Sequence, residues 1–233
     1  MARRPIQQAF EFRQHGGKRK GAGRPRKPGL PCEPHGKRPP LRARWPVHAI
    51  LRVERGLGNL RTRNKYHAVR RALHTTHKRT DFRVVHISVQ STHVHLVVEA
   101  ANEVALGRGL QGFQIAAAKQ LNATVQRKGR VFADRYHARI LQSPRDVRNV
   151  INYVLNNWRH HHEDERIETR YWMVDYFSSG PTFSGWKDPP GESPPGYEPL
   201  ATKPPETWLL AVGWKRWGEL ATYAMPGRHC YEG

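Results

Sequence analysis

Two adjacent apolar segments in the middle of the chain constrain its fold most strongly. Residues 82–90 (FRVVHISVQ) and 93–100 (HVHLVVEA) are rich in valine and isoleucine, and a two-residue break separates them. Such a pair is typical of an antiparallel β-hairpin. The second segment begins with His-Val-His, and alternate residues of a strand point to the same side of a sheet. The two histidine Cα atoms would lie about 6.6 Å apart, so both rings could reach one metal ion.

The sequence around this hairpin alternates between strand-like and helix-like segments. Apolar residues recur with period two in some segments and at helical spacing in others. The patterns predict a strand at 46–53, a looser strand region at 130–141, helices at 60–79, 103–129 and 144–160, and a helix or helix-turn at 207–225. Ser143 followed by Pro144 suits the first positions of a helix. The order up to residue 160 predicts an α+β fold, with helices packed on one face of an antiparallel sheet.

The predicted helix 144–160 places a tyrosine and an amide together. On a wheel of about 100° per residue, Tyr153 and Asn157 lie on one shoulder of the apolar stripe. Asn156 falls on the far side, so the wheel favours Asn157 as the inward amide, although the two adjacent asparagines leave the choice open. Two imidazoles and an amide oxygen would leave metal coordination positions open for phosphate oxygens.

Each of these elements is weak when taken alone. A lone Tyr153 on a helix shoulder is more often an aromatic residue at the edge of the core. Histidines at positions 93 and 95 could be ordinary strand residues or half of a structural zinc site. The combination constrains the interpretation much more strongly, because a metal beside a positioned tyrosine is what an enzyme that nicks DNA with a tyrosine nucleophile requires.

The charge of the chain points to a polyanionic partner. Lys and Arg number 40 against 19 acidic residues, and residues 1–160 hold 33 of the basic side chains and 8 of the acidic ones. Such a field attracts nucleic acid. A basic RNA-binding or ribosome-associated protein is an alternative, but it would not require the paired histidines together with Tyr153 and Asn157.

The composition divides the chain into three parts. Residues 1–43 are basic and rich in Gly and Pro, which predicts a disordered DNA-contacting tail. Within this tail GAGRPRKPG resembles an AT-hook, in which Arg24, Arg26 and Lys27 would contact the DNA minor groove; a non-specific phosphate-binding tail is the alternative. Residues 44–162 form the predicted folded domain. Residues 163–233 are rich in Pro and Trp and predict an irregular C-terminal extension.

Three motifs together resemble a known family. They are SVQSTHVHLVVEA (88–100), the long helix before RVFADRYHARIL (130–141), and NVINYVLNNW (149–158). Over roughly residues 40–160 the chain resembles REP-associated tyrosine transposases, members of the single-tyrosine HUH transposase group. The resemblance implies a ferredoxin-like catalytic domain, a Mg or Mn ion, and single-stranded or hairpin DNA as substrate. It implies His93, His95 and Asn157 as metal ligands and Tyr153 as the nucleophile.

The expected activity is therefore metal-dependent nicking and rejoining of DNA through a 5′-phosphotyrosine intermediate. A catalytically inactive, domesticated hairpin-binding protein of the same descent is the alternative. Arg135 and Arg139 are expected to contact DNA, although a solvated strand face would look the same. Both a monomer and a homodimer are compatible with the sequence.

The location of the protein follows from what its sequence lacks. Cys32 and Cys230 lie near opposite ends and provide neither a disulfide framework nor metal-ligand spacing. No apolar run approaches 18 residues, and the N-terminus shows no apolar signal region. We therefore expect no membrane partner and a cytoplasmic, nucleoid-associated location.

Overall fold

The structure is a computed structural model that describes residue 36 and residues 38–225. The AT-hook-like segment and nearly all of the predicted tail 1–43 lie outside the described residues. The strands and α-helices follow one another as β1 (Val47–Arg52), α1 (Arg63–His77), β2 (Phe82–Val89), β3 (His93–Ala100), α2 (Glu103–Thr124), β4 (His137–Ile140), α3 (Pro144–His160) and α4 (Trp208–Ala211). Within this part of the chain, no helix is both long and apolar enough to span a membrane.

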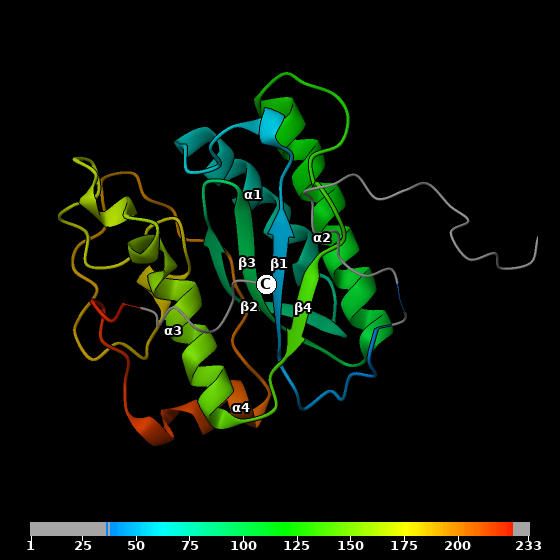
Figure 1. Cartoon of the computed structure of the whole chain (residues 1–233), viewed down its shortest axis with the longest axis vertical. Coiled ribbons are helices and arrows are strands. Elements are labelled where there is room, and N and C mark those ends of the chain that lie inside the picture. The colour runs from blue at the N-terminus through cyan, green and yellow to red at the C-terminus, as the bar shows by residue number, and fades with distance from the viewer. Residues whose placement is uncertain (1–35, 37, 226–233) are drawn as a thin grey trace, which may run out of the picture. The chain divides into compact units, whose positions relative to one another are not determined.

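The four strands form one antiparallel sheet in the order β2-β3-β1-β4 (Figure 1). The connection β1-α1-β2-β3-α2-β4 with this strand order is the ferredoxin-like arrangement. The predicted α+β ferredoxin-like class is thus confirmed. The predicted hairpin is the β2-β3 pair, whose register changes once at a β-bulge between Val84 and His86.

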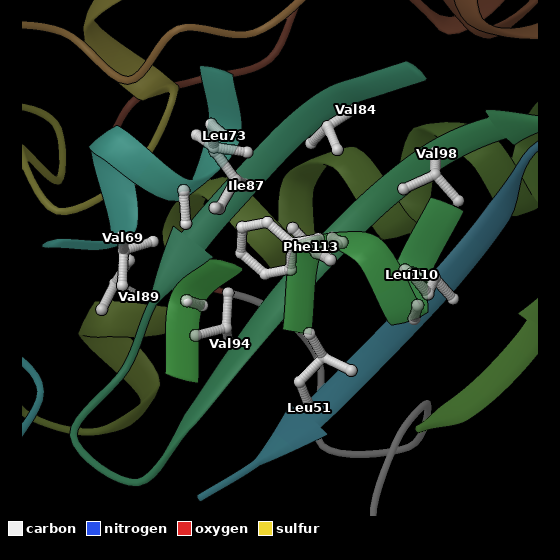
Figure 2. Packing of buried hydrophobic residues seen from close by; sticks show 14 of the residues in the cluster. Leu51, Val69, Leu73, Val84, Ile87, Val89, Val94, Val98, Leu110 and Phe113 are labelled. Carbon is white, nitrogen blue, oxygen red and sulfur yellow. The ribbon is translucent and has the colours of Figure 1, made fainter. Parts of the chain in front are cut away.

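One side of the sheet, here called the apolar face, is covered by α1 and α2. Its side chains come from alternate strand positions and pack with the two helices in one cluster, which includes Leu51, Val69, Leu73, Val84, Ile87, Val89, Val94, Val98, Leu110 and Phe113 (Figure 2). Helix α2 approaches the sheet closely at Gly109, where an added Cβ would lie 2.2 Å from the Phe82 ring. A side chain at this position would therefore push the helix away from the strand.

The other side of the sheet, here called the histidine face, carries His48, His93 and His95 and is partly covered by α3. Val85 and Val97 on this side pack with the apolar stripe of α3 in a second cluster. The prediction of helices on one face therefore holds for α1 and α2, whereas α3 packs against the opposite face. The reason is that Val85 of β2 and Val97 of β3 present apolar surface on this second side, and α3 covers them.

The long helix 103–129 ends earlier than its sequence pattern predicts. Helix α2 stops at Thr124, and Gln126 and Gly129 then adopt positive φ angles of 51° and 99°. The Asn122 side-chain amide donates to the carbonyl of Gly129 at 2.8 Å, which holds this turn. After Val125 the sequence offers only polar residues up to Gly129, so a further helical turn would bury no apolar surface.

Of the helix and the helix-turn predicted for 207–225, the structure has the second, because α4 has four residues and a 3₁₀ turn, Gly213–Trp217, follows it. Two glycines explain the interruption. A Cβ at Gly213 would lie 2.8 Å from the ring of Trp208, and Gly218 has a φ of 77°. The chain can fold back on itself at these positions only without a side chain.

The C-terminal extension covers the outer edge of β2. The Val89 amide donates to the Phe177 carbonyl at 2.8 Å, and the Ser179 amide donates to the Ile87 carbonyl at 2.8 Å. Further along, the Lys203 amide donates to the Val84 carbonyl at 2.9 Å. The extension thus occupies hydrogen-bonding groups that an open edge strand would offer to other chains.

Candidate active site

The two histidines of β3 lie on the histidine face, as the strand alternation predicts. Between them Val94 points into the core on the apolar face. The Nε2 atoms of His93 and His95 are 2.8 Å apart. His95 is almost completely buried, and His93 is half-buried at the start of the strand. The pair is therefore accessible from one side and sheltered on the other.

Helix α3 brings Tyr153 and Asn157 to the same place. Ser143 begins this helix as predicted, since its hydroxyl accepts a hydrogen bond from the Asp146 amide at 3.1 Å. The Nδ2 atom of Asn157 lies 3.0 Å from Nε2 of His95, and the half-buried Tyr153 ring lies 5.3 Å from the His95 ring. Four residues predicted from two separate segments are thus brought together.

The two adjacent asparagines of α3 have different surroundings. Asn156 is fully buried, and its Nδ2 donates to the Asn152 side chain at 2.9 Å and to the Ala221 carbonyl at 3.3 Å. Asn157 faces the histidines instead, and the buried Oδ1 atoms of both asparagines have no hydrogen-bond partner among the described residues. A buried carbonyl oxygen without a partner is costly unless a ligand completes it.

The histidines of the site are held in the neutral form. Burial, reinforced by the charges of His161 and Arg52, lowers the pKa of His93 to about 4. Burial, together with neighbouring histidines, lowers the pKa of His95 well below its usual value. A neutral imidazole keeps a lone pair on one ring nitrogen, and such a nitrogen can bind a metal ion without first losing a proton.

A third histidine, which the sequence patterns do not single out, belongs to this cluster. His48 of β1 is completely buried, and its Nε2 lies 3.1 Å from Nδ1 of His95. The two rings are stacked at 5.2 Å with an angle of 22° between their planes. A histidine within the apolar strand PVHAILRV was a visible signal, but the neighbour of this strand in the sheet could not be read from the sequence.

Known proteins similar to this chain include a family of transposases and a solved structure. Residues 45–157 match a protein-family model described as "Transposase IS200 like". No curated protein matches the chain. A solved structure described as a REP-associated tyrosine transposase bound to a REP hairpin is 14% identical, with a TM-score of 0.46 over 55% of this chain and 74% of that one.

The donor atoms of His93, His95 and Asn157 suit a divalent metal ion. Among the described residues, no group of three His, Cys, Asp or Glu side chains is arranged to hold a metal. The contacts of His95 with His93 and Asn157 measure 2.8 and 3.0 Å. Adjacent ligands of an octahedral ion with bonds of about 2.1 Å are separated by about 3 Å. His93, His95 and Asn157 therefore fit an ion once the amide presents its oxygen.

The arginines predicted to contact DNA lie at or near β4. Arg139 is paired in register with His48 of β1, so it belongs to the histidine face. It forms an ion pair of 3.0 Å with Asp146, and its side chain is 39% exposed. Arg135 lies just before the strand and is half-buried. Arg24, Arg26 and Lys27 lie outside the described residues, so all five DNA contacts stay predictions.

A buried ion pair joins the C-terminal extension to the segment before α1. The Arg61 guanidinium, just before α1, donates two hydrogen bonds of 2.9 Å to the carboxylate of Asp175. Its Nε also lies 3.4 Å from a carboxylate oxygen of Glu163, and all three side chains are at least 95% buried. The extension is therefore held to the domain by charged groups as well as by apolar packing.

Proposed function

We propose that this transposase domain nicks and rejoins single-stranded or hairpin DNA, with Tyr153 as the nucleophile. The observation that carries the proposal is the position of Tyr153 next to the cluster of His93, His95 and Asn157. A tyrosine at the edge of the core needs no such neighbours, whereas a nucleophile that attacks a phosphodiester needs a group that neutralises phosphate charge. The match of residues 45–157 to the IS200-like transposase family model supports the same proposal.

In the proposed reaction the Tyr153 oxygen attacks the phosphorus of one phosphodiester. A bond forms between phosphorus and the phenolic oxygen, and the bond to the 3′-oxygen breaks. The phenol loses its proton, and the leaving 3′-oxygen gains one, so no water is consumed. The product is a 5′-phosphotyrosine, which keeps the energy of the phosphodiester and allows rejoining to another 3′-hydroxyl.

The remaining residues of the site would hold and neutralise the phosphate. His93, His95 and Asn157 would hold a Mg or Mn ion. Such an ion, when bound, polarises the scissile phosphate and offsets its charge. The low pKa values of His93 and His95 keep their rings neutral and ready to bind at physiological pH. The half-buried setting of Tyr153 limits access of water while leaving one side open to a DNA strand.

The proposal is tested by trapping the covalent intermediate. Purified protein is incubated with hairpin DNAs labelled at the 3′ end, in Mn²⁺, in Mg²⁺ and in chelator, and the products are separated on a denaturing protein gel. Wild-type protein should give a labelled adduct with metal and none in chelator. Tyr153→Phe should give no adduct. Tyr171→Phe is the matched control, because Tyr171 is 81% exposed and outside the site, and it should behave as wild type.

The same assay distinguishes an active nuclease from a catalytically inactive DNA-binding protein of the same descent. Tight binding of a hairpin without any adduct, across a broad pool of sequences, would contradict the proposed nuclease and favour a DNA-binding protein. The large positive charge of residues 1–160 would favour DNA binding by an active nuclease and by an inactive protein alike. An adduct that persists in Tyr153→Phe would instead move the nucleophile to another residue.

The proposed third ligand is tested with two neighbouring variants. Asn157→Leu should weaken Mn²⁺ binding at least about tenfold, measured by titration calorimetry. Asn156→Leu removes the hydrogen bonds to Asn152 and Ala221 but should leave the Mn²⁺ affinity close to wild type. The opposite result would assign the ligand to Asn156.

A further inference from the structure

We propose that His48 is a positioning residue, which accepts a hydrogen bond from Nδ1–H of His95 and so directs the unprotonated Nε2 of His95 toward His93 and Asn157. This inference rests on the proposed function, because it assigns a role to a residue that contacts one of the proposed metal ligands. It concerns the tautomer of one ring rather than the reaction itself. It can therefore be tested in metal-free protein without DNA.

The geometry around His95 leaves each ring nitrogen with a different neighbour. Nε2 of His95 lies 2.8 Å from Nε2 of His93 and 3.0 Å from Nδ2 of Asn157. Nδ1 of His95 lies 3.1 Å from Nε2 of His48, within hydrogen-bond distance. One nitrogen thus faces the proposed metal site, and the other faces the buried interior of the sheet.

These contacts determine where the proton of His95 belongs. A neutral imidazole has one nitrogen that donates and one that accepts. The amide nitrogen of Asn157 can only donate, so Nε2 of His95 must accept and its proton must be on Nδ1. If the amide turns to present Oδ1 to a metal ion, Nε2 must again be unprotonated in order to bind the same ion. Both arrangements require an acceptor opposite Nδ1, and Nε2 of His48 lies there.

The surroundings of His48 suit this task. Metal-binding histidines commonly donate their second N–H to an acceptor, which fixes the ring and its tautomer. His48 is completely buried on the neighbouring strand β1, and its ring stacks against that of His95. The edge of the His48 ring also contacts Tyr153, with 6.1 Å between ring centres. His48 therefore contacts both the proposed ligand His95 and the proposed nucleophile Tyr153.

Three variants separate positioning from simple packing. His48→Gln keeps an acceptor oxygen near the place of Nε2, whereas His48→Leu keeps an apolar side chain but removes the acceptor. His86→Leu is the matched control, because His86 is a buried histidine of the same sheet face whose ring contacts Phe183. Far-UV circular dichroism shows whether each variant is folded before it is compared.

The first measurement is the ¹⁵N–¹H spectrum of metal-free protein labelled at histidine. The His95 signals are identified by their loss in His95→Gln. Wild type and His48→Gln should show the proton of His95 on Nδ1, and His48→Leu should show a mixed or reversed tautomer. A wild-type protein with the proton on Nε2 would overturn the proposal, even if His48→Leu does not fold.

The second measurement is Mn²⁺ affinity by titration calorimetry. His48→Leu should bind about 10- to 100-fold more weakly than wild type, while His48→Gln and His86→Leu should stay within about threefold. Equal losses in His48→Gln and His48→Leu would mean that His48 acts through packing alone. If Tyr153 forms no adduct but both measurements follow these expectations, the proposed nuclease fails and the positioning role of His48 stands.

Discussion

The two faces of the sheet come from alternate residues of the same strands, yet their chemistry is different. On β3 the apolar face receives Val94, Leu96 and Val98, which are packed under α1 and α2. The histidine face receives His93 and His95 from the same strand. The difference teaches that the alternation of side chains along one strand is enough to place a stabilising core on one face of the sheet and a site that can do chemistry on the other.

The covers of the two faces differ as well. Helices α1 and α2 cover the apolar face with a continuous core (Figure 2). Helix α3 packs on the histidine face over Val85 and Val97 and places Tyr153 and Asn157 on its shoulder. We therefore expect changes on the histidine face to remove activity and changes on the apolar face to remove stability.

The largest effect is expected for Tyr153→Phe. This change removes one hydroxyl at the rim of the histidine face, so adduct formation should fall at least about 10³-fold. The melting temperature should change by no more than about 3 °C, because the aromatic ring and its packing are kept. Thermal unfolding followed by circular dichroism, beside the gel assay, checks both parts. A large loss of stability would contradict the separation of the two faces.

A loss of stability without a loss of activity is expected for Leu96→Ala. Leu96 follows His95 in the chain but lies on the apolar face. Leu96 is fully buried, so the truncation should lower the free energy of unfolding by about 3 kcal/mol. Urea denaturation measures this loss. The folded fraction should still form the adduct at a rate near that of wild type. An adduct rate that falls as far as in Tyr153→Phe would show that the faces are not independent.

The attachment of the C-terminal extension can be tested at the Arg61–Asp175 ion pair. Asp175→Ala leaves a buried guanidinium without its main partner, so we expect a loss of about 3 kcal/mol in urea denaturation. The double variant Arg61→Met, Asp175→Ala removes the charge as well and should recover part of this loss. A double variant that is less stable than Asp175→Ala would mean that the pair itself stabilises the fold.

The smallest effect concerns the pH dependence of stability, through the buried His86 of the histidine face. Burial lowers the pKa of His86 from 6.5 to about 4. Between these values the unfolded chain binds a proton that the folded protein does not, so stability is lost as the pH falls from 6.5 to 4. His86→Leu should flatten this dependence by at most about 1.4 kcal/mol per pH unit. Urea denaturation at several pH values measures the slope, and an unchanged slope would contradict the buried neutral state.

Much of this arrangement is readable from the sequence because it depends on local patterns. The hairpin follows from two β-branched segments with a short break, and the start of α3 follows from Ser143 and Pro144. The side of α3 that carries Tyr153 and Asn157 follows from helix periodicity. These features involve neighbours in the chain, and the structure has all of them.

The remaining features depend on contacts between distant segments. The role of His48 requires knowing that β1 lies beside β3, and the placement of α3 requires knowing that Val85 and Val97 meet on one face of the sheet. The early end of α2 and the shortness of α4 depend on turn conformations at Gly129, Gly213 and Gly218. Local periodicity carries no information on such contacts, so these features could not be predicted.

The most direct test of the central claim is mass spectrometry of the trapped adduct after trypsin digestion. Cleavage after Arg148 and Arg159 releases residues 149–159, in which Tyr153 is the one hydroxyl-bearing side chain. The proposed mechanism predicts that this peptide carries a nucleotide remnant attached through a 5′-phosphate to Tyr153. A remnant on a different peptide, or an unmodified peptide 149–159 in protein that has cleaved DNA, would contradict it.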